Sequence, residues 1–335
     1  MCIRDSGYGR DLVDTELLKR VEILKGPSSA LYGSDGLAGA ILYITKDPSD
    51  LASENDVYQS ITAGYDSDNE HSKVSYLAAN VGEKMEGLIQ ITARDVSETE
   101  LHDDAAKKPN PFSGEQSSIF LKGKYLINDN LGLTLTYDTQ ESEGDWNLNS
   151  TLGTSGYPQM VSTTSSIGDD DISRDRVSLS LDFSADSGLF DNGSFSIYSQ
   201  DTDQRQITTI DKSIVGNFVN GARGPQFVPN IPPTPIREFK DYIFDQSIDG
   251  FAVQFYKSIE SESGAVHNIV YGAEQESIDV SRPRYRTETN LMTNAVNSNI
   301  GGELYPNKTF PDTETERTAF LSIIELIFLI KLPLF

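Results

Sequence analysis

The residues best placed to do chemistry lie in one glycine-rich stretch, "GPSSALYGSDG" at residues 26–36. A phosphate-binding loop needs the pattern GxxxxGK[ST], because its lysine and backbone amides hold the phosphates. Here Gly33 is followed by serine. A serine nucleophile on a strained turn needs GxSxG, which "GPSSA" does not supply. We interpret the glycines and serines as turn residues between two short strands, "RVEIL" and "AILYIT".

Metal and cofactor chemistry has few candidate ligands in this sequence. His71, His102 and His267 are far apart and Cys2 is the single cysteine, so no zinc spacing and no CxxC pair is present. The run Asp169–Asp171 offers oxygen ligands but lacks the spacing of a calcium loop. The sequence therefore predicts no catalytic residue, no resident metal and no intrinsic cofactor, and we expect no enzyme activity.

The charge of the chain is strongly acidic. Its 335 residues include 27 Lys and Arg against 51 Asp and Glu, which gives a formal net charge of −24. Such a balance disfavours nucleic acid as a partner. Two interpretations of so many carboxylates are open. A solvated acidic surface is the simpler one, and a divalent-cation site is the more specific one.

Stretches in which apolar and polar residues alternate dominate the chain after residue 55. In "LGLTLTYDT", Leu131, Leu133, Leu135 and Tyr137 fall on one face and polar side chains on the other. This period-2 pattern is typical of half-buried strands. It predicts ten strands, near residues 57–65, 73–81, 87–95, 115–127, 131–141, 174–184, 194–204, 247–258, 265–280 and 313–320.

The connections between these strands alternate in length. The turn at 128–130 is short, whereas the connections at 142–173 and 205–246 are long and polar. In an up-and-down sheet, alternate connections lie at opposite ends. Tight turns at one end and large loops at the other are typical of an outer-membrane barrel, which must close because lipid cannot satisfy an open strand edge. A β-sandwich or a propeller also has alternating strands, but neither predicts this asymmetry.

The stretch "LLKRVEILKGPSSALYGSDGLAGAILYITKDP" at residues 17–48 resembles the end of the plug domain of TonB-dependent outer-membrane receptors. Lys25 stands where this family usually has Arg, and Tyr43 where it has Asn. The variants "SALYGSDGLAGAILYITKDPSDL" and "YPNKTFPDTETERTAF" resemble the haem/haemoglobin (haemoglobin–transferrin–lactoferrin) branch. The matching positions are Arg20, Val21, Glu22, Gly26, Pro27, Leu31, Tyr32, Gly33, Gly39, Thr45 and Lys46.

The resemblance implies an all-β fold, a transmembrane β-barrel of about 22 antiparallel strands that follows a plug. This chain would carry the C-terminal part of the plug and about the first ten barrel strands. We expect four segments: a non-native leader at 1–6, plug at 7–53, the N-terminal half of the barrel at 54–320 and an aberrant tail at 321–335. Such a half barrel has two open edges, so we expect the chain alone not to be a working transporter.

The resemblance also implies a function and partners. The expected function is active uptake of an iron-containing ligand, haem or a haem protein, across the outer membrane of Gram-negative bacteria. The energy would come from TonB through an upstream segment, and outer-membrane lipid would surround the barrel. A siderophore or vitamin B12 receptor is the nearest alternative, and a β-rich surface adhesin is the alternative from another class.

Two sets of residues are candidates for this function. The plug signature would have a structural and gating role, with Arg20 and Glu22 forming a salt bridge either to the barrel or within the plug. His102, in an expected external loop, is the one histidine proposed as a haem ligand. The signature residues are Arg20, Glu22, Lys25, Gly26, Pro27, Tyr32, Gly33 and Gly39.

Overall fold

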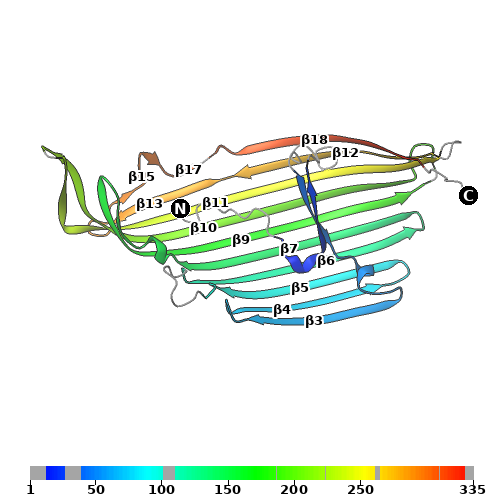
Figure 1. The fold of residues 1–335 in the computed structure, drawn as a ribbon, viewed down its shortest axis with the longest axis horizontal. Helices are drawn as coiled ribbons and strands as arrows, with labels where there is room; N and C mark the ends of the chain where they lie inside the picture. Colours follow the sequence, from blue (N-terminus) through cyan, green and yellow to red (C-terminus); the bar gives the residue numbers. More distant parts are fainter. Residues whose placement is uncertain are drawn as a thin grey trace, which may run out of the picture.

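The computed structural model describes residues 13–26, 39–100, 110–185, 187–222, 224–260, 265–308 and 310–328. Nearly all of this part is β-strand (Figure 1). Its helical content is three single 3-10 turns: η2 (Thr15–Leu17), η3 (Pro48–Asp50) and η4 (Asn149–Thr151). No helix in these ranges is long and apolar enough to cross a membrane. The predicted all-β fold is confirmed.

One large antiparallel sheet forms the body of the described chain (Figure 1). Its long strands pair in chain order, which is the up-and-down topology of a barrel wall. They are β3 (Asp56–Asp66), β4 (His71–Val81), β5 (Met85–Ser97), β6 (Phe112–Asn128), β7 (Leu131–Asn147), β9 (Gln159–Ser184), β10 (Asn192–Gly221), β11 (Gly224–Glu260), β12 (Ala265–Ser281) and β18 (Thr313–Phe328).

Short strands complete the fold. On the large sheet, β8 (Gly153–Ser155) pairs with β9, β13 (Pro283–Asn290) with β11, and both β14 (Val296–Asn297) and β17 (Asn307–Lys308) with β13. β15 (Asn299–Ile300) and β16 (Glu303–Leu304) form a small hairpin. β1 (Leu18–Lys25) and β2 (Gly39–Thr45) form a separate two-stranded sheet, which lies across one face of the large sheet (Figure 1).

All ten strands predicted from the alternation are present, but the prediction of long loops at 142–173 and 205–246 is wrong in large part. β9 begins at Gln159, and β10 and β11 stay paired as far as Gly221 and Gly224. Backbone pairing of β10 with β11 holds this projecting hairpin, and Arg237 Nε lies 2.8 Å from Asp211 Oδ1 across the two strands. Its strands therefore need no alternating apolar residues, which is why the period-2 pattern missed them.

The last predicted strand, at residues 313–320, is longer in the structure. β18 continues through residues 321–328, the first part of the segment set apart as a tail, and stays paired with β12 as far as Ala265.

The two faces of the large sheet differ in chemistry. Apolar side chains such as Ile119 and Leu121 are exposed on one face. The hairpin β1–β2 lies on the other, which we call the inner face. Residues directly opposite each other on paired strands point to the same face, so the register traces a continuous polar row along the inner face of β5, β6, β7, β9 and β10. This row is Thr92, Ser118, Gln140, Arg174 and Thr202.

Candidate functional site: the contact between the hairpin and the sheet wall

The candidate site is the contact between the segment with the plug-like sequence and the inner face of β4, β5 and β6. Leu17, at the end of η2, is 2% exposed and packs with Leu77, Leu88 and Phe120 from these three strands. Phe120 has no exposed surface. Burying these side chains supplies a non-directional attraction between the segment and the wall, and Leu51 adds to the same cluster.

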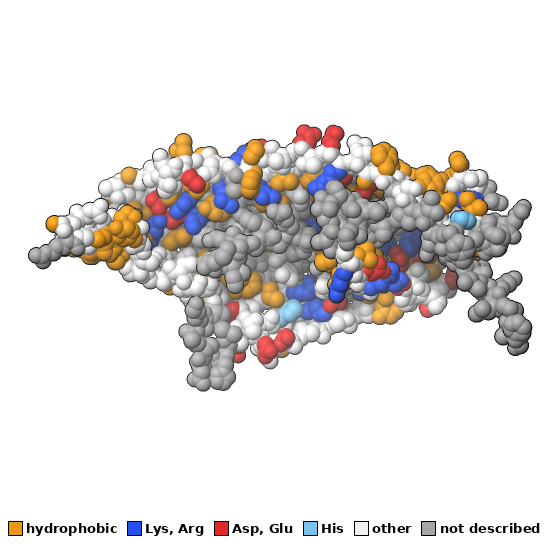
Figure 2. Space-filling model, turned by 45° about the horizontal axis from the view of Figure 1, so that its top comes forward, with side chains coloured by type: hydrophobic (Ala, Val, Ile, Leu, Met, Phe, Trp, Pro, Cys, Tyr) orange, Lys and Arg blue, Asp and Glu red, His pale blue; other side chains and the backbone are white. Residues whose placement is uncertain are grey.

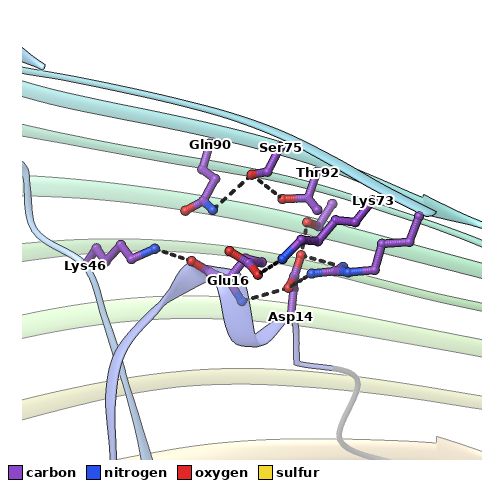
Figure 3. Close-up of polar contacts among 9 residues, drawn as sticks. Asp14, Glu16, Lys46, Lys73, Ser75, Gln90 and Thr92 are labelled. Atoms are coloured by element: carbon purple, nitrogen blue, oxygen red, sulfur yellow. Dashed lines mark hydrogen bonds and ion pairs between the residues drawn. The ribbon is translucent and has the colours of Figure 1, made fainter. Parts of the chain in front are cut away.

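Asp14 is the centre of the polar contacts around this cluster (Figure 3). Its carboxylate accepts hydrogen bonds from Arg94 Nη2 at 2.6 Å and Nη1 at 3.0 Å, and from the Ser118 hydroxyl. It also caps η2 by accepting from the Glu16 amide at 2.9 Å. Burial alone would raise the pKa of Asp14, but the hydrogen bonds from Arg94, Ser118 and Glu16 lower that pKa below its usual value.

Glu16 makes the second ionic contact with the wall. Its carboxylate lies 2.5 Å from Lys73 Nζ of β4. Its backbone carbonyl accepts a 2.5 Å hydrogen bond from Lys46, which follows β2 (Figure 3). Both chain ends of the β1–β2 hairpin are thereby tied to each other and to the wall.

Asp47 makes the third ionic contact, just after β2. Its carboxylate lies 2.9 Å from Lys124 Nζ and 3.1 Å from Lys122 Nζ, both on the inner face of β6. Lys122 also donates to Thr45 Oγ1 at 2.8 Å. Burial would raise the pKa of Asp47, but the two lysines lower that pKa below its usual value. All three contacts pair a hairpin carboxylate with a wall cation.

The wall beside these contacts is polar and tightly bonded. Ser75 and Thr92 lie 3.0 Å apart, oxygen to oxygen, and Gln90 Nε2 donates to Ser75 at 3.4 Å (Figure 3). Gln90 Oε1 is buried and has no hydrogen-bond partner in the described part of the chain. The site holds ion pairs and hydrogen bonds, which break and reform without covalent chemistry, so it is suited to reversible docking.

The two charged signature residues pair with each other. Arg20 Nε lies 2.6 Å from Glu22 Oε1 within β1, and their side chains are 52% and 43% exposed. An ion pair this exposed contributes less than about 1 kcal/mol. Lys25 ends β1. The contacts with the wall are made instead by the three carboxylates described above.

The signature glycines that the structure describes both have positive φ. Gly26 follows β1 with φ +112°, and Gly39 begins β2 with φ +150°. A Cβ on Gly39 would lie 2.3 Å from the Leu24 carbonyl oxygen, so only glycine fits there. Pro27, Tyr32 and Gly33 lie outside the described residues.

The two histidines that the structure describes lie on different strands. His71 begins β4, and its Nε2 is buried with no hydrogen-bond partner among the described residues. His267 lies in β12, opposite Leu326 of β18. His102, the predicted haem ligand, falls outside the described residues. No group of three or more His, Cys, Asp or Glu side chains in the described ranges is arranged to hold a metal ion.

The residues that form the site were missed by the sequence analysis. Asp14, Glu16 and Asp47 are common surface residue types outside the plug signature, and their partners lie tens of residues away along the chain. The one available signal was the pair Lys122 and Lys124, two charges on the polar face of a predicted strand. A sequence does not reveal which carboxylates such lysines meet.

Parts of this chain are similar to known proteins. Residues 3–40 match the TonB-dependent Receptor Plug Domain. Hemoglobin-binding protein A of Haemophilus influenzae is 31% identical over 150 residues, which is 40% of this chain and 15% of that protein. The hemin receptor of Yersinia enterocolitica is 31% identical over 127 residues, 37% of this chain and 18% of the receptor. The matched part is thus less than a fifth of each relative's length.

A solved structure is also similar. The ferric yersiniabactin uptake receptor FyuA from Yersinia pestis matches 91% of this chain and 48% of the receptor, with 12% identity and a TM-score of 0.47.

The fold and the site together define a class, an antiparallel barrel wall that carries a plug-type hairpin on its inner face. Within that class, residues 3–40 are similar to the plug domain of TonB-dependent receptors, and the relatives of part of the chain include haemoglobin-binding proteins and a hemin receptor. The resemblance predicted from residues 17–48 is confirmed.

Proposed function

We propose that the protein acts in a TonB-dependent receptor that takes up haem, supplied free or by a haem protein, across the outer membrane of Gram-negative bacteria. The observation that carries this proposal is the identity with haemoglobin-binding and hemin receptors, combined with the plug match at residues 3–40. A siderophore or vitamin B12 receptor, which would share the fold and the plug, is the alternative.

The two faces of the sheet support a place in a lipid bilayer. The exposed apolar side chains of the outer face would contact lipid, and the polar row of the inner face would line a wet lumen. Residues 54–320 would then be the barrel wall and residues 7–53 the end of the plug. TonB, haem or a haem protein, and outer-membrane lipid are the partners that follow.

The hairpin contact supplies a mechanism for opening. The ion pairs of Asp14, Glu16 and Asp47 hold the end of the plug against the wall at rest. In a hydrated lumen each pair is worth a few kcal/mol at most. A pull on the plug from the periplasm would break them one after another and free the wall of β4–β6. Their charges would guide the hairpin back when the pull ends.

Ligand titration tests the proposed function. The 335-residue chain, refolded in detergent micelles, is titrated with haemin and, separately, with a ferric catecholate siderophore and with vitamin B12. We expect a shift of the haemin Soret band and no response to the other two ligands. A response to the siderophore or vitamin B12 alone would refute the haem assignment.

His102 is proposed as an iron ligand within this function. The variant His102→Ala should lose the Soret shift, while the matched variant His267→Ala, in a strand of the wall, should retain it. An unchanged Soret shift in His102→Ala would reject His102 as a ligand.

A further inference from the structure

Three arginines at alternate positions line the inner face beside the projecting hairpin of β10 and β11. Arg284 and Arg286 belong to β13, and Arg282 comes two residues before Arg284. The register places Arg284 directly opposite Tyr242 of β11. Tyr242 and Gln246 are an even number of residues apart on β11, so their side chains point to the same face. Gln246 lies opposite Thr202 of the polar row. The arginines therefore point to the side on which the plug hairpin lies.

Each guanidinium lies over an aromatic ring. A guanidinium contacts a ring with its flat face, so the edge that carries its N–H groups remains available for an oxygen ligand. The pairs, measured from the arginine Cζ to the ring centroid, are Arg284 over Tyr242 at 4.8 Å, Arg282 over Phe244 at 4.9 Å and Arg286 over Tyr305 at 5.9 Å.

The three arginines differ in their ionic partners. Arg286 Nε lies 2.5 Å from the buried carboxylate of Glu238, which also accepts from Lys212 at 2.7 Å. Arg282 and Arg284 have no carboxylate within ion-pair distance in the described part of the chain. Arg282 Nε is moreover buried with no hydrogen-bond partner there.

Uncompensated arginines are unexpected in this protein. The chain carries a net charge of −24, so carboxylates are abundant, yet none is placed beside Arg282 or Arg284. A buried donor without a partner is costly, so the placement of Arg282 is maintained at the expense of a hydrogen bond. The aromatic rings would hold both side chains in place before the ligand arrives, which lowers the entropy lost on binding.

Figure 2 shows groups of Lys and Arg side chains on the face of the molecule that it presents. The spacing of Arg282 and Arg284 suits a ligand with two anionic groups, because alternate residues of a strand lie about 6.6–6.8 Å apart. Two guanidinium edges at this separation match two carboxylates on one molecule. Tyr242 and Phe310, which lies 5.6 Å from Arg282 Cζ by its ring centroid, add aromatic surface.

We propose that Arg282 and Arg284 form a binding site for a planar aromatic dicarboxylate, a porphyrin, by pairing with its two carboxylates. The proposal rests on the proposed function, since it names residues that would receive the same ligand. It does not involve the iron, so it is separable from any axial ligand such as His102.

Metal-free protoporphyrin IX is the probe that tests this site. The full chain in detergent micelles is titrated with protoporphyrin IX and followed by porphyrin absorbance. The double variant R282Q/R284Q should bind about 100-fold more weakly, or about tenfold for each lost charge-assisted contact. Arg237→Gln is the matched control, because Arg237 lies on the neighbouring strand β11, faces the other side and pairs with Asp211. It should bind as the wild type does.

Two further measurements make the result specific. Protoporphyrin IX dimethyl ester keeps the ring but loses both charges, so it should bind weakly and equally to the wild type and the double variant. Arg284→Lys keeps the charge but loses the planar fork, so it should bind at an intermediate level. Far-UV circular dichroism of each variant should match that of the wild type, which shows that the strands are retained.

The outcomes separate this site from the proposed function. Equal binding of protoporphyrin IX by the wild type and R282Q/R284Q would overturn the arginine site and leave haem uptake standing. Binding that is equally strong for the ester would also overturn it, because the carboxylates would then not matter. No binding of protoporphyrin IX by the wild type would also overturn the arginine site, whereas haem uptake is overturned only if the haemin titration fails as well.

Discussion

Replacing Asp14 by Asn tests whether the hairpin is held to the wall by its ion pairs. The Asp14 and Arg94 side chains are only 3% and 12% exposed. The substitution removes the negative charge that faces two Arg94 nitrogens and the Ser118 hydroxyl, while the Asn oxygen can still cap the Glu16 amide. Arg94 is left without its counter-charge on the inner face.

The magnitude follows from the burial of this pair. Removing one member of a buried ion pair costs about 3–5 kcal/mol. Arg94 retains some contact with solvent, so the lower end, about 3 kcal/mol, applies to the free energy of hairpin docking. This corresponds to an increase of about 100-fold in the population of the undocked hairpin.

Hydrogen exchange measures this population. The Lys46 amide donates to the Leu17 carbonyl at 3.1 Å, at the base of the β1–β2 hairpin and beside the contacts with the wall. We expect this bond to open when undocking exposes the hairpin base to solvent. Exchange of the Lys46 amide should become about 100-fold faster in Asp14→Asn. Exchange in β9 and β10 should not change, and the control Glu115→Gln, on the outer face of β6, should leave Lys46 unaffected.

A double-mutant cycle with Arg94→Gln completes this test. The loss of docking free energy in the double variant should be smaller than the sum of the losses in the two single variants, because each single variant leaves the other partner without its counter-charge. Unchanged Lys46 exchange in Asp14→Asn would refute the reasoning, since the hairpin would then be held by Leu17 and its apolar neighbours alone.

The remaining predictions concern the same contact. The pKa of Asp14 is lowered in the docked state, so its stabilising effect is fully present above the unfolded pKa of about 3.9 and is lost as the pH falls through the docked-state pKa. Hairpin protection, corrected for the intrinsic exchange rate, should therefore be constant from pH 7 to about pH 4 and decline below that range. Phe120→Ala should lower the free energy of unfolding by about 3–5 kcal/mol in urea titrations, and an unchanged midpoint would contradict the buried cluster. Gly39→Ala should loosen the β1–β2 hairpin, because φ +150° and the nearby carbonyl oxygen exclude a Cβ, and faster exchange in β2 would show this. Lys122→Met should weaken docking less than Asp14→Asn does, because Asp47 keeps a second lysine; an effect as large as that of Asp14→Asn in the Lys46 exchange assay would argue against this ranking.

The strands of the wall could be predicted because alternation is a local property. The stretch "SSIFLKGKYLI" indicates the two faces directly, because the apolar Ile119 and Leu121 alternate with positions that share a face with the charged Lys122 and Lys124. The β10–β11 projection could not be predicted in this way. Its strands are held by backbone pairing and cross-strand ion pairs such as Arg237 with Asp211, and such partners are 26 residues apart in the sequence.

The sequence by itself determined the class of this protein. The plug-like stretch at 17–48 and the alternation after residue 55 were sufficient for an all-β receptor-type fold, since both signals depend only on neighbouring residues. The tertiary structure decided which charges matter. Asp14 and Arg94 are 80 residues apart and meet only because the segment that contains η2 packs on the inner face of β5. Arg20 and Glu22, the pair that the sequence favoured, lie exposed to solvent on β1.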